Sequence, residues 1–199
     1  MKIIRAADCR TTPWKNGGGE TTEIAVSPGS ASLDDFDWRI SMARVASDGP
    51  FSEFVGIDRS LAVTTGSGLA LTIGDAADVV LDGASEPVQF AGDTPTSARL
   101  LAGPITDLNV MTRRGRFEHR LQRVSAVTTC DFGDHQIGAI VAAISEVSLL
   151  APQGVVTLTR GDAAILTSAA DAPCRIVPAP ASACYLALLR EFRGQAGSA

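Results

Sequence analysis

The chain has 199 residues, of which 45% are hydrophobic and 20% are charged, and its formal net charge is −5. This length and composition allow the chain to bury a core of its own, which excludes an intrinsically disordered protein. The acidic balance and the lack of any long Lys/Arg run give no support to nucleic-acid binding.

Short runs rich in Val, Ile, Leu and Thr alternate with Gly, Pro and Asp clusters along the chain, and long helical periodicity is almost absent. Close spacing of such runs predicts an all-β sandwich or barrel. In the stretch 116–127, Phe117, Leu121 and Val124 have helical spacing, but strands flank it, so a strand is favoured over a short helix. The other expected strands are Thr21–Val26, Trp38–Ala46, Leu61–Thr65, Leu69–Ile73, Val79–Leu81, Val88–Phe90, Ala98–Ala102, Leu108–Arg113, Gln136–Ile144, Val155–Thr159, Ala163–Thr167 and Ala183–Leu189.

A weak internal repeat suggests two related halves. Gly92-Asp93 and Gly161-Asp162 each precede a strand of small residues, and a later strand follows each of them. Gly-Asp turns are common in any β-protein, so a chance likeness is the alternative. We expect one compact unit spanning residues 1–199, with approximate halves at residues 1–116 and 117–199.

Alternate residues of a strand share a face, and several strands carry a polar row where a core strand would carry leucines. Arg39 and Ser41 share one face of their strand, and Asp107, Asn109, Met111 and Arg113 share one face of theirs. Each row faces either solvent or an interior cavity, and for any one strand solvent is the simpler interpretation. Because several strands repeat the pattern beside Gly-rich loops, we expect a polar pocket.

The segment WKNGGGE, residues 14–20, is the second candidate feature. It is either a flexible loop before a strand or a loop whose backbone approaches a ligand closely, as glycine allows. Lys15 would supply a charge, Asn16 a donor and an acceptor, and Trp14 an apolar wall. Further along, Arg59 is expected to pair with Asp58 or to bind a carboxylate.

Metal, nucleophile and disulfide signals are weak. There are two histidines, His119 and His135, without metal-ligand spacing, and no G-x-S-x-G motif, so we expect no metal and no cofactor. The four cysteines form no C-x-x-C, which indicates free thiols, although a Cys174–Cys184 bridge stays open. No signal-peptide core or membrane-length apolar run is present, so a cytoplasmic protein without a membrane partner is expected.

Four motifs together resemble the HutD/Ves family of bacterial proteins. They are PWKNGGGETTEI, WRISMARVASDGPFSEFVGIDRSL, GSGLAL and AGPITDLNVMTRRGRF, and they run in order from about Pro13 to Phe117. The resemblance implies a metal-free, cupin-like (RmlC-like) β-barrel fold in a bicupin arrangement of two related halves. It also implies a regulator of histidine utilisation that binds a small acidic metabolite, urocanate or N-formylglutamate.

On this basis WKNGGGE is expected to close over the mouth of the pocket, while Lys15, Arg39 and Arg113 offset a ligand carboxylate. The alternative is a metal-independent isomerase or lyase with Glu20 or Glu23 as base and Lys15 as acid. A protein-binding scaffold is a third hypothesis, and a homodimer is left open. The expected ligand-binding residues are Trp14, Lys15, Asn16, Thr22, Arg39, Ser41, Phe51, Ser52, Arg59, Asn109, Met111 and Arg113.

Overall fold

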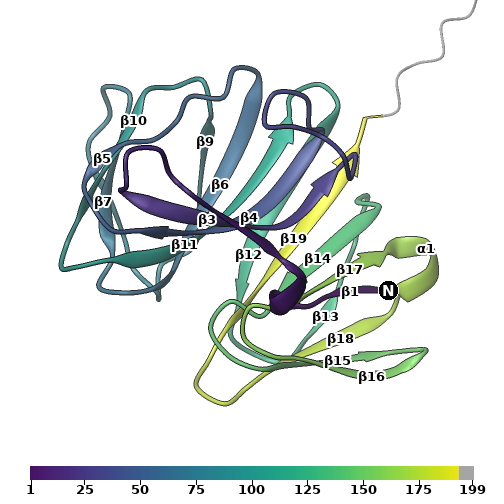
Figure 1. Ribbon diagram of the computed structural model, residues 1–199. Helices are drawn as coiled ribbons and strands as arrows, with labels where there is room; N and C mark the ends of the chain where they lie inside the picture. Colours follow the sequence, from purple (N-terminus) through teal and green to yellow (C-terminus); the bar gives the residue numbers. More distant parts are fainter. Residues whose placement is uncertain (193–199) are drawn as a thin grey trace, which may run out of the picture.

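The computed structural model describes residues 1–192, and almost all of its regular structure is β-strand (Figure 1). One short α-helix, α1 (Ser168–Asp171), and one 3-10 turn, Ala6–Asp8, accompany the strands in this part of the chain. The strands are β1 (Lys2–Ile4), β2 (Arg10–Pro13), β3 (Gly19–Ser27), β4 (Trp38–Val45), β5 (Gly49–Pro50), β6 (Ile57–Thr65), β7 (Leu69–Ile73), β8 (Val79–Leu81), β9 (Val88–Ala91), β10 (Thr96–Leu100), β11 (Ile105–Arg113), β12 (Phe117–Val124), β13 (Thr128–Cys130), β14 (Ile137–Val141), β15 (Val147–Ala151), β16 (Gly154–Leu158), β17 (Ala163–Thr167), β18 (Cys174–Pro178) and β19 (Cys184–Glu191).

The strands form four antiparallel sheets that pack as two sandwiches. In the N-terminal sandwich, a six-stranded sheet ordered β2-β3-β4-β11-β6-β9 faces a four-stranded sheet ordered β5-β10-β7-β8. In the C-terminal sandwich, a five-stranded sheet ordered β1-β17-β14-β19-β12 faces a four-stranded sheet ordered β13-β18-β15-β16. The all-β prediction is therefore confirmed, and the architecture is cupin-like.

The strand order repeats between the two sandwiches. The orders β9-β6-β11-β4 and β5-β10-β7-β8 recur as β17-β14-β19-β12 and β13-β18-β15-β16, eight strands later in each case. The sequence clue to this repeat was nevertheless wrong in detail. Gly92-Asp93 follows β9, whereas Gly161-Asp162 precedes β17, the counterpart of β9, so the two Gly-Asp turns are not equivalent.

The first strands of the chain lie outside the repeat. β2 and β3 extend the six-stranded sheet, but β1 pairs with β17 of the C-terminal sandwich, with Lys2 opposite Ile165. The N-terminal segment therefore bridges both sandwiches, as the dark purple ribbon in Figure 1 shows. The expected division of the chain near residue 116 stays a prediction.

Most expected strands are present, and three have the predicted bounds: Leu69–Ile73, Val79–Leu81 and Ala163–Thr167. The ambiguous stretch forms β12, so the helical alternative was wrong. The expected strand at Gln136–Ile144 is shorter, since β14 covers Ile137–Val141. Six strands were not expected, namely β1, β2, β5, β13, β15 and β18.

The two large sheets pack against each other and bury a shared apolar core. Trp38 and Val110 of the six-stranded sheet belong to the same cluster as Val141, Tyr185 and Leu189 of the five-stranded sheet. The Tyr185 hydroxyl donates to the Val63 carbonyl oxygen at 3.1 Å across this interface. The position of the N-terminal sandwich is therefore fixed by the C-terminal one.

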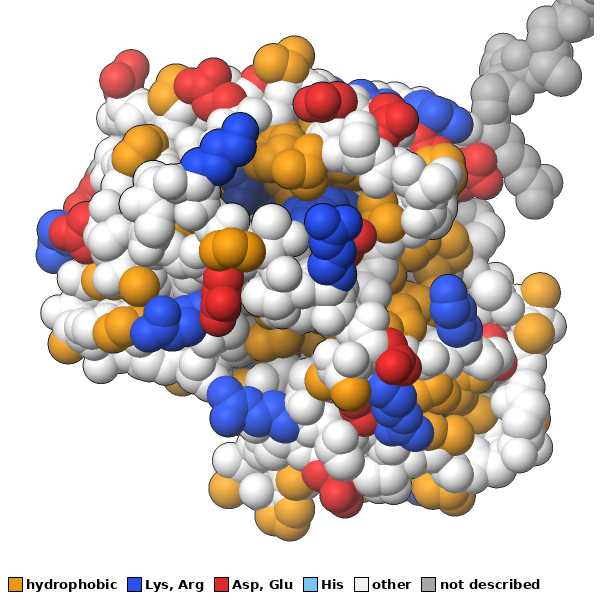
Figure 2. Space-filling model, in the orientation of Figure 1, with side chains coloured by type: hydrophobic (Ala, Val, Ile, Leu, Met, Phe, Trp, Pro, Cys, Tyr) orange, Lys and Arg blue, Asp and Glu red, His pale blue; other side chains and the backbone are white. Residues whose placement is uncertain are grey.

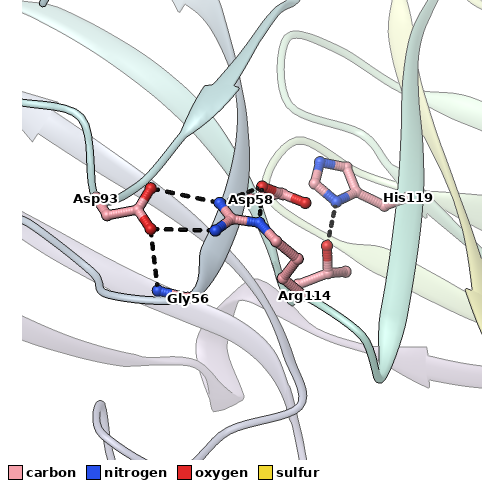
Figure 3. A network of polar contacts seen from close by, with 6 residues as sticks. Gly56, Asp58, Asp93, Arg114 and His119 are labelled. Carbon is pink, nitrogen blue, oxygen red and sulfur yellow. Dashed lines mark hydrogen bonds and ion pairs between the residues drawn. The ribbon is translucent and has the colours of Figure 1, made fainter.

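A polar network near the β11–β12 turn joins the same sheets (Figure 3). His119 of β12 is hydrogen-bonded to Thr112 at 2.7 Å and to Ser60 at 2.9 Å, and burial lowers its pKa to about 4. In the turn, Arg114 forms ion pairs with Asp58 at 2.7 Å and with Asp93 at 3.1 Å. His119 is thus a neutral, buried residue that holds two strands of the other sheet.

The four cysteines are all unpaired, so the candidate Cys174–Cys184 bridge is not formed. Cys174 instead lies opposite Cys130 across the β13–β18 pair. Burial raises the pKa of Cys184 to about 12, which keeps this thiol protonated at neutral pH.

Among the described residues, no helix has the length and apolar character needed to cross a membrane.

Candidate functional site

A cavity of about 720 Å³ opens on one face of the six-stranded sheet in the N-terminal sandwich. Strands β2, β3, β4, β6 and β11 supply its floor and one wall, and the segments 31–33 and 50–54 close it from the sides. Basic and hydrophobic side chains gather around a hollow in this part of the molecule in Figure 2. The rows of polar residues expected from strand alternation therefore face an interior cavity.

The floor is ordered by the register of three neighbouring strands. Met111 of β11 lies opposite Arg39 of β4 on one side and opposite Arg59 of β6 on the other. Two residues before Met111 on β11, Asn109 lies opposite Ser41 of β4. Residues opposite each other in a sheet project to the same face, so these side chains enter the cavity together.

Arg59 is the most deeply buried basic residue of the cavity, with 6% of its surface exposed. Its guanidinium donates to the Ser52 carbonyl oxygen at 3.2 Å and to Asn109 Oδ1 at 2.8 Å. Three phenyl rings surround it, those of Phe51, Phe54 and Phe90, with centroids 5.2, 5.5 and 5.2 Å from its Cζ. Burial lowers its pKa to about 10, so it stays charged at neutral pH. The alternative in which Arg59 pairs with Asp58 is not formed, because consecutive residues of β6 project to opposite faces of the sheet, and Asp58 binds Arg114 on its own face.

Asp107 lies on the same face of β11 and was not among the expected site residues. It is 1% exposed, and its Oδ1 accepts a hydrogen bond from Asn109 Nδ2 at 2.7 Å. Burial raises its pKa to about 7, against the opposing effect of Arg59. The strand pattern placed it beside Asn109, so alternation alone could have identified it.

Arg39 lies closer to the mouth and already has an acidic partner. Its Nε donates to Glu23 Oε2 at 2.9 Å, and its NH1 donates to Ser41 Oγ at 3.3 Å. Glu23 comes from β3, where it lies opposite Ser41 in the register with β4. The charge of Arg39 is therefore partly compensated within the protein.

The glycine run between β2 and β3 fulfils a packing role that neither sequence interpretation foresaw. A Cβ at Gly19 would lie 2.2 Å from the Arg44 carbonyl oxygen and 3.1 Å from the Trp14 ring, and one at Gly18 would lie 2.8 Å from Ser47 Oγ. Gly17 has a φ of +71°, which favours glycine. The absence of a side chain at Gly18 and Gly19 therefore allows the turn to pack closely against β4 and against the Trp14 ring.

The same turn presents polar groups to the cavity. Trp14 Nε1 donates to Thr21 Oγ1 at 2.8 Å, which fixes the indole at the rim. Asn16 Oδ1 accepts from the Gly18 N–H at 3.0 Å, so this side chain also shapes the turn. Lys15, between them, is exposed at the mouth.

Two expected site residues lie outside the cavity. Thr22 is on the opposite face of β3 from Thr21 and Glu23, and its hydroxyl is hydrogen-bonded to Thr11 at 2.8 Å. Arg113 lies at the end of β11, where it donates to the carbonyl oxygens of Phe36 and Asp34, each at 2.9 Å. It therefore anchors the chain segment before β4 and does not reach the cavity.

The other ten expected residues line the cavity together with several that were not expected. Glu20, considered as a base, is not among them. The expected lining residues are Trp14, Lys15, Asn16, Arg39, Ser41, Phe51, Ser52, Arg59, Asn109 and Met111, and the additional ones are Arg10, Thr12, Pro13, Thr21, Glu23, Ala31, Ser32, Leu33, Ala43, Pro50, Phe54 and Asp107.

Within residues 1–192, no three His, Cys, Asp or Glu side chains are grouped so that they could hold a metal ion. The polar atoms around the cavity come mainly from guanidinium, ammonium, amide and hydroxyl groups. Such groups suit hydrogen bonding and the binding of anions.

Comparison with known proteins gives a consistent result. A family model described as HutD matches residues 6–184. A 21.2 kDa protein in the hutC 3′ region of Pseudomonas putida is 37% identical over 123 residues, which span 61% of this chain and 63% of that protein, less than two thirds of its length. Protein Ves of Citrobacter koseri is 38% identical over 151 residues, covering 69% of this chain and 71% of Ves.

Solved structures agree with these relationships. The structure of HutD from Pseudomonas fluorescens SBW25 superposes with a TM-score of 0.83 at 33% identity, covering 97% of this chain and 99% of that one. A cupin 2 conserved barrel domain protein from Leptotrichia buccalis, at 10% identity and a TM-score of 0.54, matches 96% of each chain and shows the fold alone.

Proposed function

Because the chain belongs to the HutD family, we propose that it is a cupin-like protein linked to histidine utilisation whose cavity binds a small acidic metabolite. Urocanate and N-formylglutamate are the proposed ligands, bound without a metal. In this proposal the protein acts as a regulator that senses the acid and restrains the pathway.

The observation that carries the proposal is the charge of the cavity. Four basic side chains line it, those of Arg10, Lys15, Arg39 and Arg59, against only two acidic ones, Glu23 and Asp107. The chain as a whole has a net charge of −5, so this basic cavity is opposite in sign to the molecule around it. A basic concave site with low-dielectric walls favours an anionic ligand.

The size and walls of the cavity suit a small organic acid. Its volume of about 720 Å³ lies inside the range of roughly 300–1,000 Å³ typical of small-molecule sites. Trp14, Phe51 and Met111 provide apolar surface for the carbon skeleton, and Ser41 and Asn109 provide oriented hydrogen bonds. Charge-assisted hydrogen bonds contribute about 1.5–3 kcal/mol each, so two of them supply roughly 3–6 kcal/mol of the about 8 kcal/mol that micromolar binding requires. Burial of the carbon skeleton against the apolar walls would supply the rest.

The names of the relatives support the proposed link to histidine utilisation. One is named for its position in the hutC 3′ region, and the Pseudomonas fluorescens structure that superposes with this chain is that of HutD.

A second candidate function is acid–base catalysis on the bound acid, and Asp107 is the observation that favours it. A buried carboxyl with a pKa of about 7 exchanges a proton readily at neutral pH. Asp107 is better suited to this role than the proposed bases, since Glu20 is outside the cavity and Glu23 is bound to Arg39. Turnover of the ligand would distinguish an enzyme from a sensor.

The first test is calorimetric titration of the full chain with urocanate and N-formylglutamate, with the neutral amide of each acid as the chemical control. We expect the acids to bind and the amides to bind at least tenfold more weakly. Arg39→Gln should weaken acid binding roughly tenfold, whereas Arg99→Gln, an exposed arginine on β10 outside the cavity, should leave it unchanged.

Mass spectrometry of the ligand after incubation separates the two candidate functions. A regulator returns the acid unchanged, and an enzyme consumes it. If neither acid nor any other small carboxylate binds, or if the neutral amides bind as tightly as the acids, the proposed function is wrong.

A further inference from the structure

We propose that Arg59, on the floor of the cavity, is the anchor for the ligand carboxylate, with the ligand serving as its missing counter-ion. This inference rests on the proposed function and assigns the acid group to one place in the cavity. The sequence alone had favoured Lys15, Arg39 and Arg113 for this role. The geometry instead points to the buried arginine.

Arg59 is a buried cation without an ion pair. Across residues 1–192 each salt bridge involves other groups, although only 6% of the Arg59 surface is exposed. Both of its hydrogen-bond acceptors, the Ser52 carbonyl oxygen and Asn109 Oδ1, are neutral. A buried charge that is not paired is unfavourable, so an anion that reaches it gains strongly.

This guanidinium still has free donors. Its Nε is fully buried without a hydrogen-bond partner in the described part of the chain and is closed off from the cavity. NH1 and NH2 carry two N–H groups each, and the hydrogen bonds to Ser52 and Asn109 use one of each pair, so one N–H on each terminal nitrogen is left for a ligand. A guanidinium presents its donors as a planar fork that matches the two oxygens of a carboxylate. Arg59 therefore retains both charge and donor capacity for a ligand.

The surroundings of Arg59 preserve that charge for binding. The rings of Phe51, Phe54 and Phe90 hold the guanidinium by cation–π contacts and exclude water from it. Electrostatic attraction is stronger where water is excluded, so a carboxylate binds more tightly here than at the exposed Lys15.

The side-chain amide of Asn109 lies between Arg59 and the carboxyl group of Asp107. Its Oδ1 accepts from Arg59 and its Nδ2 donates to Asp107, so the amide separates the cation from the acid. Burial also raises the pKa of Asp107 to about 7, which leaves it partly neutral at physiological pH. Arg39, by contrast, is already bound to Glu23 at 2.9 Å. Arg59 is thus the basic group of the floor whose charge is least compensated.

The test uses acetate and urocanate as probes in calorimetric titrations of the full chain. We expect Arg59→Gln to weaken both acids roughly 100-fold, and Arg39→Gln to weaken them roughly tenfold. Arg59→Lys should recover part of the lost affinity, since it restores the charge but not the fork. Circular dichroism and the melting temperature without ligand establish that each variant is folded.

A second measurement does not depend on the stability of the variants. In the wild-type protein, the NMR resonance of the Arg59 Nε–H should shift on addition of acetate, and Arg59→Lys identifies the resonance by its loss. An unshifted Arg59 signal at saturating acid, or wild-type affinity in Arg59→Gln, would overturn this inference and leave the proposed function standing. Absence of binding by the wild-type protein would instead remove both.

Discussion

Asp107 couples the charge of the cavity floor to pH. It is 1% exposed, and burial raises its pKa to about 7. The other charged groups lining the cavity are Arg59, one amide away, and Arg10, Lys15, Arg39 and Glu23. Asp107 changes charge in the neutral pH range. When it is ionised, it repels a bound anion and neutralises part of the positive charge of the cavity arginines that would attract that anion.

We therefore predict that acid binding is tightest below pH 7 and weakens as pH rises to 8.5. An anion beside Asp107 favours its protonated form, so binding near neutral pH should take up a proton. Acetate titrated between pH 5.5 and 8.5, in buffers of different ionisation enthalpy, measures both effects, since acetate stays ionised throughout. Asp107→Asn, which keeps the shape and removes the titration, should flatten the profile. A wild-type profile that is already flat would contradict the prediction.

At the scale of single residues, strand alternation predicted the cavity floor but not its boundaries. Arg39, Ser41, Asn109 and Met111 face the cavity because residues of like parity share a face. The same rule placed Arg113 on this face, yet the strand ends there and its side chain turns to the backbone of residues 34–36. Where a strand stops, parity no longer determines what a side chain reaches.

At the scale of elements, the turn between β2 and β3 shows a packing constraint that composition cannot reveal. Three glycines in sequence are compatible with flexibility. At Gly19, however, a side chain has no room, because a Cβ there would lie 2.2 Å from the Arg44 carbonyl oxygen. The backbone of β4 cannot move aside without breaking its pairing with β3. The identity of the neighbour, and not the glycine run itself, determines the constraint.

Gly19→Ala should therefore lower the free energy of unfolding by about 1–3 kcal/mol, as expected when an atom is forced into a packed site. The displaced turn carries Trp14 and Lys15, so acid affinity should fall as well. Gly29→Ala is the matched control, because a Cβ at Gly29 would have no atom of the described chain within 4 Å apart from those of its own residue and its two chain neighbours. Urea unfolding of both variants measures the difference, and equal stabilities would refute the assigned contact.

Short strands were the elements hardest to predict. β2 and β13 contain mainly Thr with Arg, Pro or Cys, and they form because a neighbouring strand offers an edge to pair with. β5 has only two residues, Gly49 and Pro50, opposite β10. Pairing between segments far apart in sequence supplies these strands, so local pattern carries little information about them.

At the scale of the whole molecule, the two sandwiches share a strand order but bury one interface between their large sheets. Val110 and Trp38 on one side pack in a common cluster with Val141 and Leu189 on the other. β1 also joins the C-terminal sheet although it precedes the N-terminal sandwich in the chain. The repeat therefore describes topology, whereas the packing argues for a single cooperative unit.

This coupling predicts the response to a mutation far from the cavity. Leu189→Ala removes a fully buried side chain of β19 from the interface, and should lower the free energy of unfolding by about 2–5 kcal/mol. Both tryptophans of the chain, Trp14 and Trp38, belong to the N-terminal sandwich, so their fluorescence reports on the half that is not mutated. We expect the urea midpoints from fluorescence and from far-ultraviolet circular dichroism to shift together.

The matched control is Leu150→Ala, also in the C-terminal sandwich, where the side chain is 38% exposed and its removal should change stability by less than about 0.5 kcal/mol. Two-state unfolding requires that different probes report the same transition. If Leu189→Ala moves the circular dichroism midpoint but leaves the tryptophan midpoint in place, the sandwiches unfold independently. In that case the cavity would depend on its own sandwich alone, and the interface between the large sheets would serve only to hold the two together.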